Sequence, residues 1–198
     1  DLDAGELGEL AQADLENVFG LPIREFEAID QRLLRLVGAA NDRDHLVDVC
    51  DGDGKPDILW RNSTTGDLYV WLMNGAVQSA GAPVTPGRVA LAWDVRGLAD
   101  MDGDGHADIV WHNGTTGALY VWFMDGTTAT GGSLLSPQTL GAPWRVARIA
   151  DFDGDLSPDI LWRNDANGEL FVWRMDALTA VGGTLLTPRA SPPDWRIE

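Results

Sequence analysis

The feature of this sequence that most constrains its fold is a repeat with a period of 51 residues. The 25 residues that begin at Asp51 match the 25 that begin at Asp102 at 17 positions, and a third copy begins at Asp153. Three series of tryptophans keep the same spacing: Trp60, Trp111 and Trp162; Trp71, Trp122 and Trp173; Trp93, Trp144 and Trp195. A fixed period of roughly this length indicates a propeller, a solenoid or another repeat array.

Each repeat unit predicts four short strands. In the second unit the expected strands are residues 93–100, 108–113, 118–124 and 127–135, the last of them the weakest. Gly114 to Gly117 supplies one turn, and Asp125-Gly126 is a strong hairpin signal. The third strand is apolar on both faces, which is typical of blades stacked in a propeller. We therefore expect a mainly β fold of three four-stranded blades, at residues 46–96, 97–147 and 148–198.

Residues 1–45 lack the landmarks of the repeat. Their apolar residues between Ile23 and Val37 lie near helical spacing, and Gly38 is a plausible stop. We expect a short helical N-terminal segment. A cap over an exposed blade edge is favoured over an independent functional domain, and docking to a partner is a further alternative.

Composition excludes several classes of partner. The formal net charge of −17 argues against nucleic acid and anionic membrane surfaces, and leaves divalent cations or basic partners. A single cysteine, Cys50, excludes an internal disulfide framework, and we expect it to be a small buried residue at a strand end. No apolar run approaches the roughly 20 residues needed to span a bilayer.

The acidic loop of the second unit is a candidate metal site. Asp100, Asp102, Asp104 and Asp108 alternate so that their oxygens can converge, and the carbonyl of His106 can fill a gap. Calcium takes six to eight hard oxygen ligands in flexible geometry, whereas magnesium prefers few protein ligands and several waters. Solvated Asp-Gly turns and catalytic carboxylates are the alternatives. Convergent carboxylates repel one another without a cation, and repetition of one site argues against catalysis, so we favour calcium.

The other two loops differ from this one. The third offers Asp151, Asp153, Asp155, the carbonyl of Ser157 and Asp159. However, Leu156 replaces the glycine after the third aspartate, so a positive φ there would strain the loop. The first loop offers Asp51, Asp53, the carbonyl of Lys55 and Asp57, with Val49 at the first ligand position. We expect calcium to bind best in the second loop, then in the third, then in the first.

The unit D-x-D-G-D-G-x-x-D-I-x-W-x-N, followed by T-T-G and Y-V-W, resembles the FG-GAP/VCBS repeat family over residues 46–198. The resemblance implies a β-propeller with Ca²⁺ in the loop between the first two strands of each blade. It also implies a secreted or cell-surface setting. Members of this family usually bind a ligand, and their repeats are often appended to enzymes that act on polysaccharide or protein.

Three blades are fewer than the four to eight that propellers typically contain. Residues 195–198 match the start of a first strand, and the first unit has Asp42 where the others have tryptophan. We therefore expect either a homodimer in which two chains close a six-bladed ring, or a longer propeller of which this is a part.

The expected function is that of an extracellular calcium-binding module for a glycan or protein ligand, without catalysis. The tryptophan series could form sugar-stacking pockets between blades, although strand tryptophans more often belong to the core. Asparagines at strand ends could bind a ligand, and turn initiation explains them equally well. The candidate ligand residues are Trp60, Trp111, Trp162, Asn62, Asn113 and Asn164.

The alternative is an accessory or partial propeller of a secreted polysaccharide- or protein-degrading enzyme. The three histidines, His45, His106 and His112, neither repeat nor show ligand spacing, and no catalytic motif is present. His112 stands where the other units have Arg61 and Arg163, which we interpret as variation at a surface position.

Overall fold

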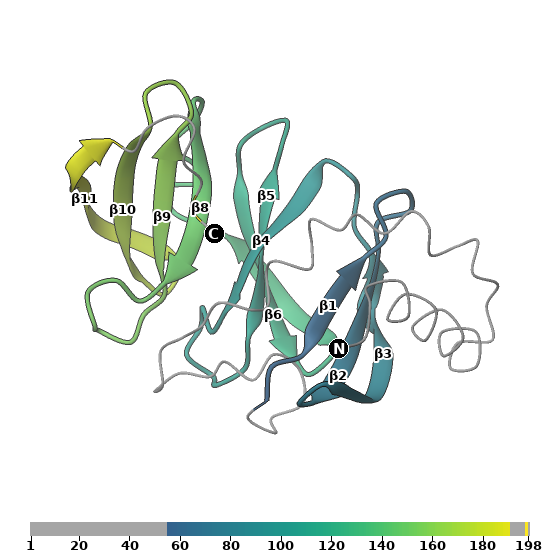
Figure 1. The fold of residues 1–198 in the computed structure, drawn as a ribbon. Coiled ribbons are helices and arrows are strands. Elements are labelled where there is room, and N and C mark those ends of the chain that lie inside the picture. The colour runs from purple at the N-terminus through teal and green to yellow at the C-terminus, as the bar shows by residue number, and fades with distance from the viewer. Residues whose placement is uncertain (1–54, 191–196, 198) are drawn as a thin grey trace, which may run out of the picture.

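The computed structural model describes residues 55–190 and residue 197. In this part of the chain eleven strands follow one another and no helix occurs, so the expected mainly β class is confirmed here (Figure 1). The helical segment expected at residues 1–45, Cys50 and the first strand of the first unit lie outside the described residues. No helix among the described residues is long and apolar enough to cross a membrane.

The strands form three groups, one for each repeat unit. The first group is β1 (Ile58–Arg61), β2 (Asp67–Asn74) and β3 (Val77–Arg88). The second is β4 (Trp93–Ala99), β5 (Asp108–Asn113), β6 (Leu119–Asp125) and β7 (Thr128–Leu134). The third is β8 (Trp144–Ala150), β9 (Asp159–Asn164), β10 (Glu169–Asp176) and β11 (Thr179–Ala190). The strands expected in the second unit therefore agree with β4–β7 to within one residue at each end.

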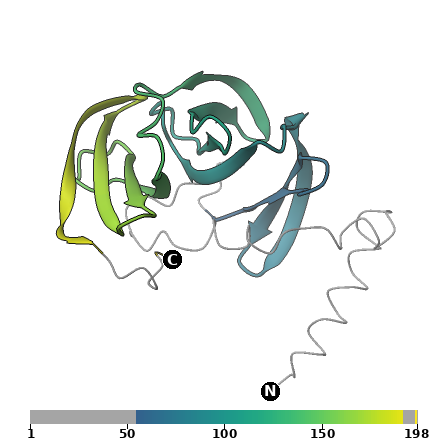
Figure 2. The ribbon, with the colours of Figure 1, turned by 90° about the horizontal axis from the view of Figure 1, so that it is seen from above.

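Successive strands within each group pair in antiparallel fashion. One parallel pair, Thr85 with Thr128, joins the outer strands β3 and β7, so the first two groups form one seven-stranded sheet. The third group is a separate four-stranded sheet. Figure 2 shows the three units side by side around an arc, with the inner strands β4 and β8 next to each other. These curled sheets resemble part of a propeller.

The second unit has a hydrophobic core on each of its faces. Ile109 and Trp111 of β5 pack in the core shared with the first unit. Val110, between them, packs in the core shared with the third unit, which includes Ile160 and Trp162. Because successive side chains of a strand point to opposite faces, both faces of β5 are buried. This explains why its sequence is an uninterrupted apolar run.

Candidate metal centre

The loop between β4 and β5 brings the acidic residues of the second unit together. Asp100 directly follows β4, and Asp108 is the first residue of β5. Between them, Gly103 and Gly105 have φ values of 80° and 91°, in the left-handed region that glycine adopts without strain. The two glycines let the chain turn back within a few residues, as the sequence predicts.

Asp100 organises the backbone of this loop. Its Oδ1 accepts hydrogen bonds from the N–H groups of Gly103, at 2.7 Å, and Asp104, at 3.1 Å. Its Oδ2 accepts one from Gly105 at 2.9 Å. The loop therefore curls around this carboxylate, and its shape is held without help from any side chain outside it.

Asp108 anchors the loop to the sheet. Its Oδ2 accepts from the N–H of Met101 at 2.9 Å, and its Oδ1 from the N–H of Met124, on β6, at 3.0 Å. Burial raises the pKa of Asp108 to about 6; the two N–H donors oppose this rise, and the charges of Asp102 and Asp104 add to it. A carboxylate that is fully buried and faces other carboxylates favours a bound cation.

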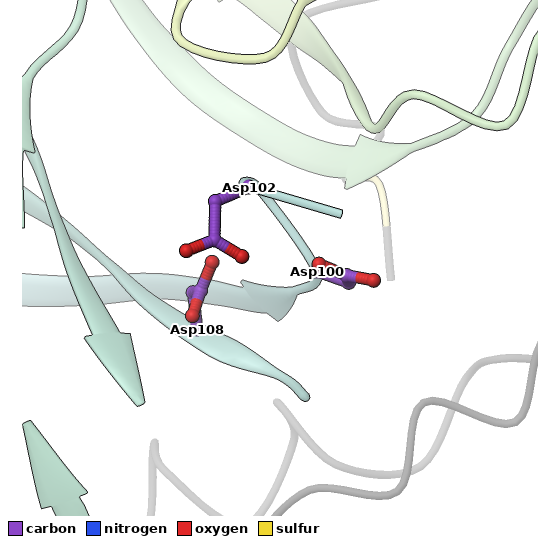
Figure 3. Close-up of side chains that lie close together, drawn as sticks. All are labelled: Asp100, Asp102 and Asp108. Carbon is purple, nitrogen blue, oxygen red and sulfur yellow. The ribbon is translucent and has the colours of Figure 1, made fainter. Parts of the chain in front are cut away.

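The oxygens of Asp100, Asp102 and Asp108 lie within 4.8 Å of one another. Figure 3 shows Asp102 and Asp108 facing each other, with Asp100 beside them. Asp104 does not join this group of three, because its Oδ1 accepts from the N–H of His106 at 2.8 Å. Three hard carboxylates around one point are a donor set that suits calcium. The residues present thus fit the metal that the sequence predicts.

The third unit repeats this arrangement at the loop between β8 and β9. Its carboxylates of Asp151, Asp153 and Asp159 also lie within 4.8 Å of one another. Buried Asp159 accepts from the N–H of Phe152 at 3.1 Å and from that of Met175 at 2.9 Å. Its pKa is raised, mainly by burial. Asp155 stays outside the group and accepts from the N–H of Ser157 at 2.8 Å.

Asp151 plays the part of Asp100 in the third loop. Burial raises the pKa of Asp151, but hydrogen bonds from four backbone N–H groups, Leu156 and Gly154 foremost, outweigh it and leave the pKa lowered. These bonds stabilise the charged form of the carboxylate, which is the form that a metal ion binds.

Leu156 answers the question that the sequence raises about the third loop. Its φ is 76°, close to the 91° of Gly105 at the equivalent position. The loop therefore keeps the shape of the second one and places a leucine in a conformation that costs an L-residue roughly 1–2 kcal/mol. The side chain is 68% exposed, so no burial of its own offsets this strain.

The first loop is described only from Lys55 onward. Asp57 is buried, and its Oδ1 accepts from the N–H of Met73, on β2, at 2.9 Å. This is the anchor that Asp108 and Asp159 make in the other units. Asp51, Asp53 and Val49 lie outside the described residues, so the set expected in this loop stays a prediction.

The tryptophans proposed as ligand residues lie mostly inside the protein. Trp111 and Trp162 are buried, and Trp60 is half-buried. Each packs against the next tryptophan of its unit, with ring centroids 5.2 Å apart for Trp111 and Trp122 and 4.8 Å apart for Trp162 and Trp173. Their main role in the structure is to build the blade cores, which the sequence already favours.

The three asparagines form turns. Oδ1 of Asn113 accepts from the N–H groups of Thr115 and Thr116, at 2.9 and 3.0 Å. Asn62 and Asn164 bond the equivalent N–H groups of their own units. Turn initiation is therefore what their carboxamide oxygens do here, and ligand binding by these residues stays a prediction.

The interpretation of position 112 as a surface position is wrong. The equivalent Arg61 and Arg163 are buried, and His112 is half-buried. Nδ1 of His112 lies 3.4 Å from Nη2 of Arg96, and the pKa of His112 is lowered, mainly by burial and then by Arg96. The position sits where one unit stacks on the next. The 51-residue spacing between Arg61 and Asp94 of successive units was the signal that could have identified it only once the stacking was known.

Comparison with known families agrees with the geometry. The sequence model of the FG-GAP-like repeat matches residues 50–111 and 100–162, which together are more than half of the chain. The chain belongs to the FG-GAP-like repeat family. The overlap of the two matched segments falls on the acidic loop of the second unit. Searches of the curated proteins and of the solved structures find no match.

Proposed function

We propose that this FG-GAP-like chain is an extracellular, non-catalytic, calcium-binding β-propeller module for a glycan or protein ligand. Its blades would be residues 46–96, 97–147 and 148–198. One observation carries the proposal: the same cluster of three carboxylates, with the same backbone anchors, stands at the same loop in two successive units. A repeated site of this kind is typical of structural ions.

The residues that would hold calcium are Asp100, Asp102 and Asp108 in the second unit and Asp151, Asp153 and Asp159 in the third. The ion would supply positive charge where these carboxylates converge. Because Asp108 also bonds the N–H of Met124 on β6, the site links the loop to two strands of its blade. Calcium would in this way stiffen each blade.

The absence of catalysis is part of the proposal. General acid and base pairs need carboxylates whose environments differ. Asp108 and Asp159 instead have matching surroundings: each is buried, accepts two N–H bonds, and has a raised pKa. Repetition supports a scaffold role.

The extracellular setting rests on the family and on calcium supply. Extracellular modules bind calcium with dissociation constants of about 10⁻⁴–10⁻³ M. Exposed Asp102 and Asp153 leave each site open to solvent on one side, which suits such modest affinity. We therefore place the module in a calcium-rich compartment.

Further blades would complete the ring, since three units describe only an arc. They would come from a second copy of the chain, giving six blades, or from a longer propeller. The mass of the calcium-loaded protein in solution distinguishes a dimer from a monomer, and a strict monomer would exclude the six-bladed homodimer.

Glycan and protein arrays probed in calcium and in chelator test the proposed function. Ligand retention that depends on calcium is the expected result. Turnover of a polysaccharide or protein, or no retained ligand in either buffer, would contradict it.

A further inference from the structure

A cavity of about 300 Å³ opens between the first and second units. Four aromatic side chains of the second unit line it: Trp93, Trp111, Tyr120 and Trp122. The connection between β3 and β4 lines it as well, with Arg88, Val89 and Ala90. Small-molecule pockets typically have volumes of roughly 300–1,000 Å³, so this one has room for a single ring-sized group.

The aromatic walls are fixed in place by their neighbours. Trp93 and Tyr120 meet edge to face with centroids 6.2 Å apart, and Trp111 and Trp122 do so at 5.2 Å. Gly132, on β7, makes room for the Tyr120 ring, because a Cβ there would lie 2.6 Å from Cε1 of Tyr120. Trp93, Tyr120 and Trp122 are half-buried, so each keeps part of its surface for a ligand.

Trp111 adds a polar group to these walls. Its side chain is buried, and its indole N–H has no hydrogen-bond partner. The indole N–H groups of Trp60 and Trp162 share this property, so it belongs to the repeat rather than to one side chain. A buried donor without a partner is costly, and a ligand that brings an acceptor oxygen would satisfy it.

The charges around the cavity select against ions. Exposed Arg88 lies at its rim and donates to Asp67, with Nε 2.8 Å from Oδ1. The Cζ atom of Arg61 lies 5.7 Å from the centroid of the Trp111 ring. These two guanidinium groups repel a cationic ligand, and the net charge of −17 repels a polyanion. The cavity therefore favours a neutral ligand with an apolar face and acceptor oxygens.

We infer that this cavity binds one ring of a neutral saccharide. The C–H face of a pyranose packs against Trp93 and Trp122, while a hydroxyl or ring oxygen accepts the N–H of Trp111. Donors of Arg88 that do not face Asp67 bind a second oxygen at the rim. The inference rests on the proposed binding function and names the place and the chemical class of the ligand.

Tryptophan fluorescence tests this inference with the full chain in calcium. The probes are the methyl glycosides of glucose, galactose and mannose, with glucuronate and choline as charged comparators. A neutral glycoside should change the fluorescence saturably. Trp93→Ala should weaken its affinity by about tenfold. Trp144→Ala, the equivalent change in the third unit, should leave that affinity unchanged.

Two milder variants keep the test decisive if Trp93→Ala does not fold. Arg88→Thr introduces the residue that the second unit has at position 139, and Tyr120→Phe the one that the third unit has at position 171. Arg88→Thr should weaken binding by about threefold. Tyr120→Phe keeps the ring and should bind as the wild type does.

Three results would overturn the inference: no response to any neutral glycoside, unchanged affinity in both Trp93→Ala and Arg88→Thr, or tighter binding of glucuronate or choline. An array ligand whose binding survives both changes would leave the module intact and remove only this cavity from its function. Failure of the arrays to retain any ligand would instead overturn the proposed function itself.

Discussion

Arg61 of β1 reaches from the first unit into the second, where its Nη1 atom lies 3.4 Å from Oδ1 of Asp94 on β4. Its Nη2 also donates to the carbonyl of Ala90 at 3.2 Å, and its guanidinium group lies over the Trp111 ring. Because the Arg61 side chain is only 7% exposed, these groups replace the water that its charge would otherwise have. The pair therefore helps to hold two units in register.

One repeat later, the equivalent positions hold His112 and Arg145, so an arginine at 112 would face another arginine. We expect His112→Arg to lower the free energy of unfolding by about 1–2 kcal/mol, because it introduces a poorly paired, partly buried charge. Adding Arg145→Asp should restore much of this loss by recreating the pair of the first junction.

Urea unfolding of both variants and of Arg145→Asp alone measures the coupling. The single Arg145→Asp change is the control, since it also removes the ion pair of Arg145 with Asp165. A double variant no more stable than the sum of the single changes predicts would show that the two positions do not interact.

Leu156→Gly should stabilise the third unit. The change relieves a left-handed leucine, and the greater freedom of glycine in the unfolded chain offsets part of the gain. We expect the free energy of unfolding to rise by up to about 1 kcal/mol. The reverse change at the matched position, Gly105→Leu, should lower it. Thermal unfolding in calcium checks both, and stabilisation by Gly105→Leu would contradict the strain at this position.

The stability of the calcium-free protein should fall as the pH rises from about 4 to about 6. Asp108 has a folded pKa of about 6 against an ordinary value of 3.8, so in this range the folded state keeps a proton that the unfolded state has lost. Asp159 shifts in the same direction. Urea unfolding in chelator measures the slope. Asp108→Asn should flatten it, and an unchanged slope in the Asp108→Asn, Asp159→Asn double variant would contradict the role of these two groups.

Much of the fold follows from the sequence because the repeat gives three versions of one pattern. Strand β5 was predicted at its observed bounds, since its apolar run, its preceding acidic loop and its terminal asparagine recur together. The convergence of Asp100, Asp102 and Asp108 followed from their alternation. The side chain of Asp104 did not follow, because a local hydrogen bond to the N–H of His106 competes with the centre of the loop.

Contacts between units were the part that the sequence could not supply. Arg61 and Asp94 lie 33 residues apart and meet only because β1 and β4 stack in neighbouring blades. A charged residue at a strand end therefore reads as exposed until the stacking is known. The same holds for the cavity beside Trp93, whose walls come from three strands and a connection.

The two interpretations of the asparagines can also be separated. Asn113→Ala removes the acceptor for the N–H groups of Thr115 and Thr116 and should lower the free energy of unfolding by about 1 kcal/mol. Asn113→Asp keeps an accepting oxygen and should cost less. Chemical unfolding gives both values. Full stability of Asn113→Ala, combined with loss of an array ligand, would favour the ligand role instead.

The most direct test of the proposed calcium module is calorimetric titration of the chelator-stripped chain with Ca²⁺. At least two ions per chain should bind, and Asp108→Asn and Asp159→Asn should each remove one of them, because each carboxylate anchors a separate cluster. The melting temperature should rise with calcium in the wild type and rise less in each variant. Absence of calcium binding in the wild type, or the same stoichiometry in both variants as in the wild type, would contradict calcium binding at these two loops.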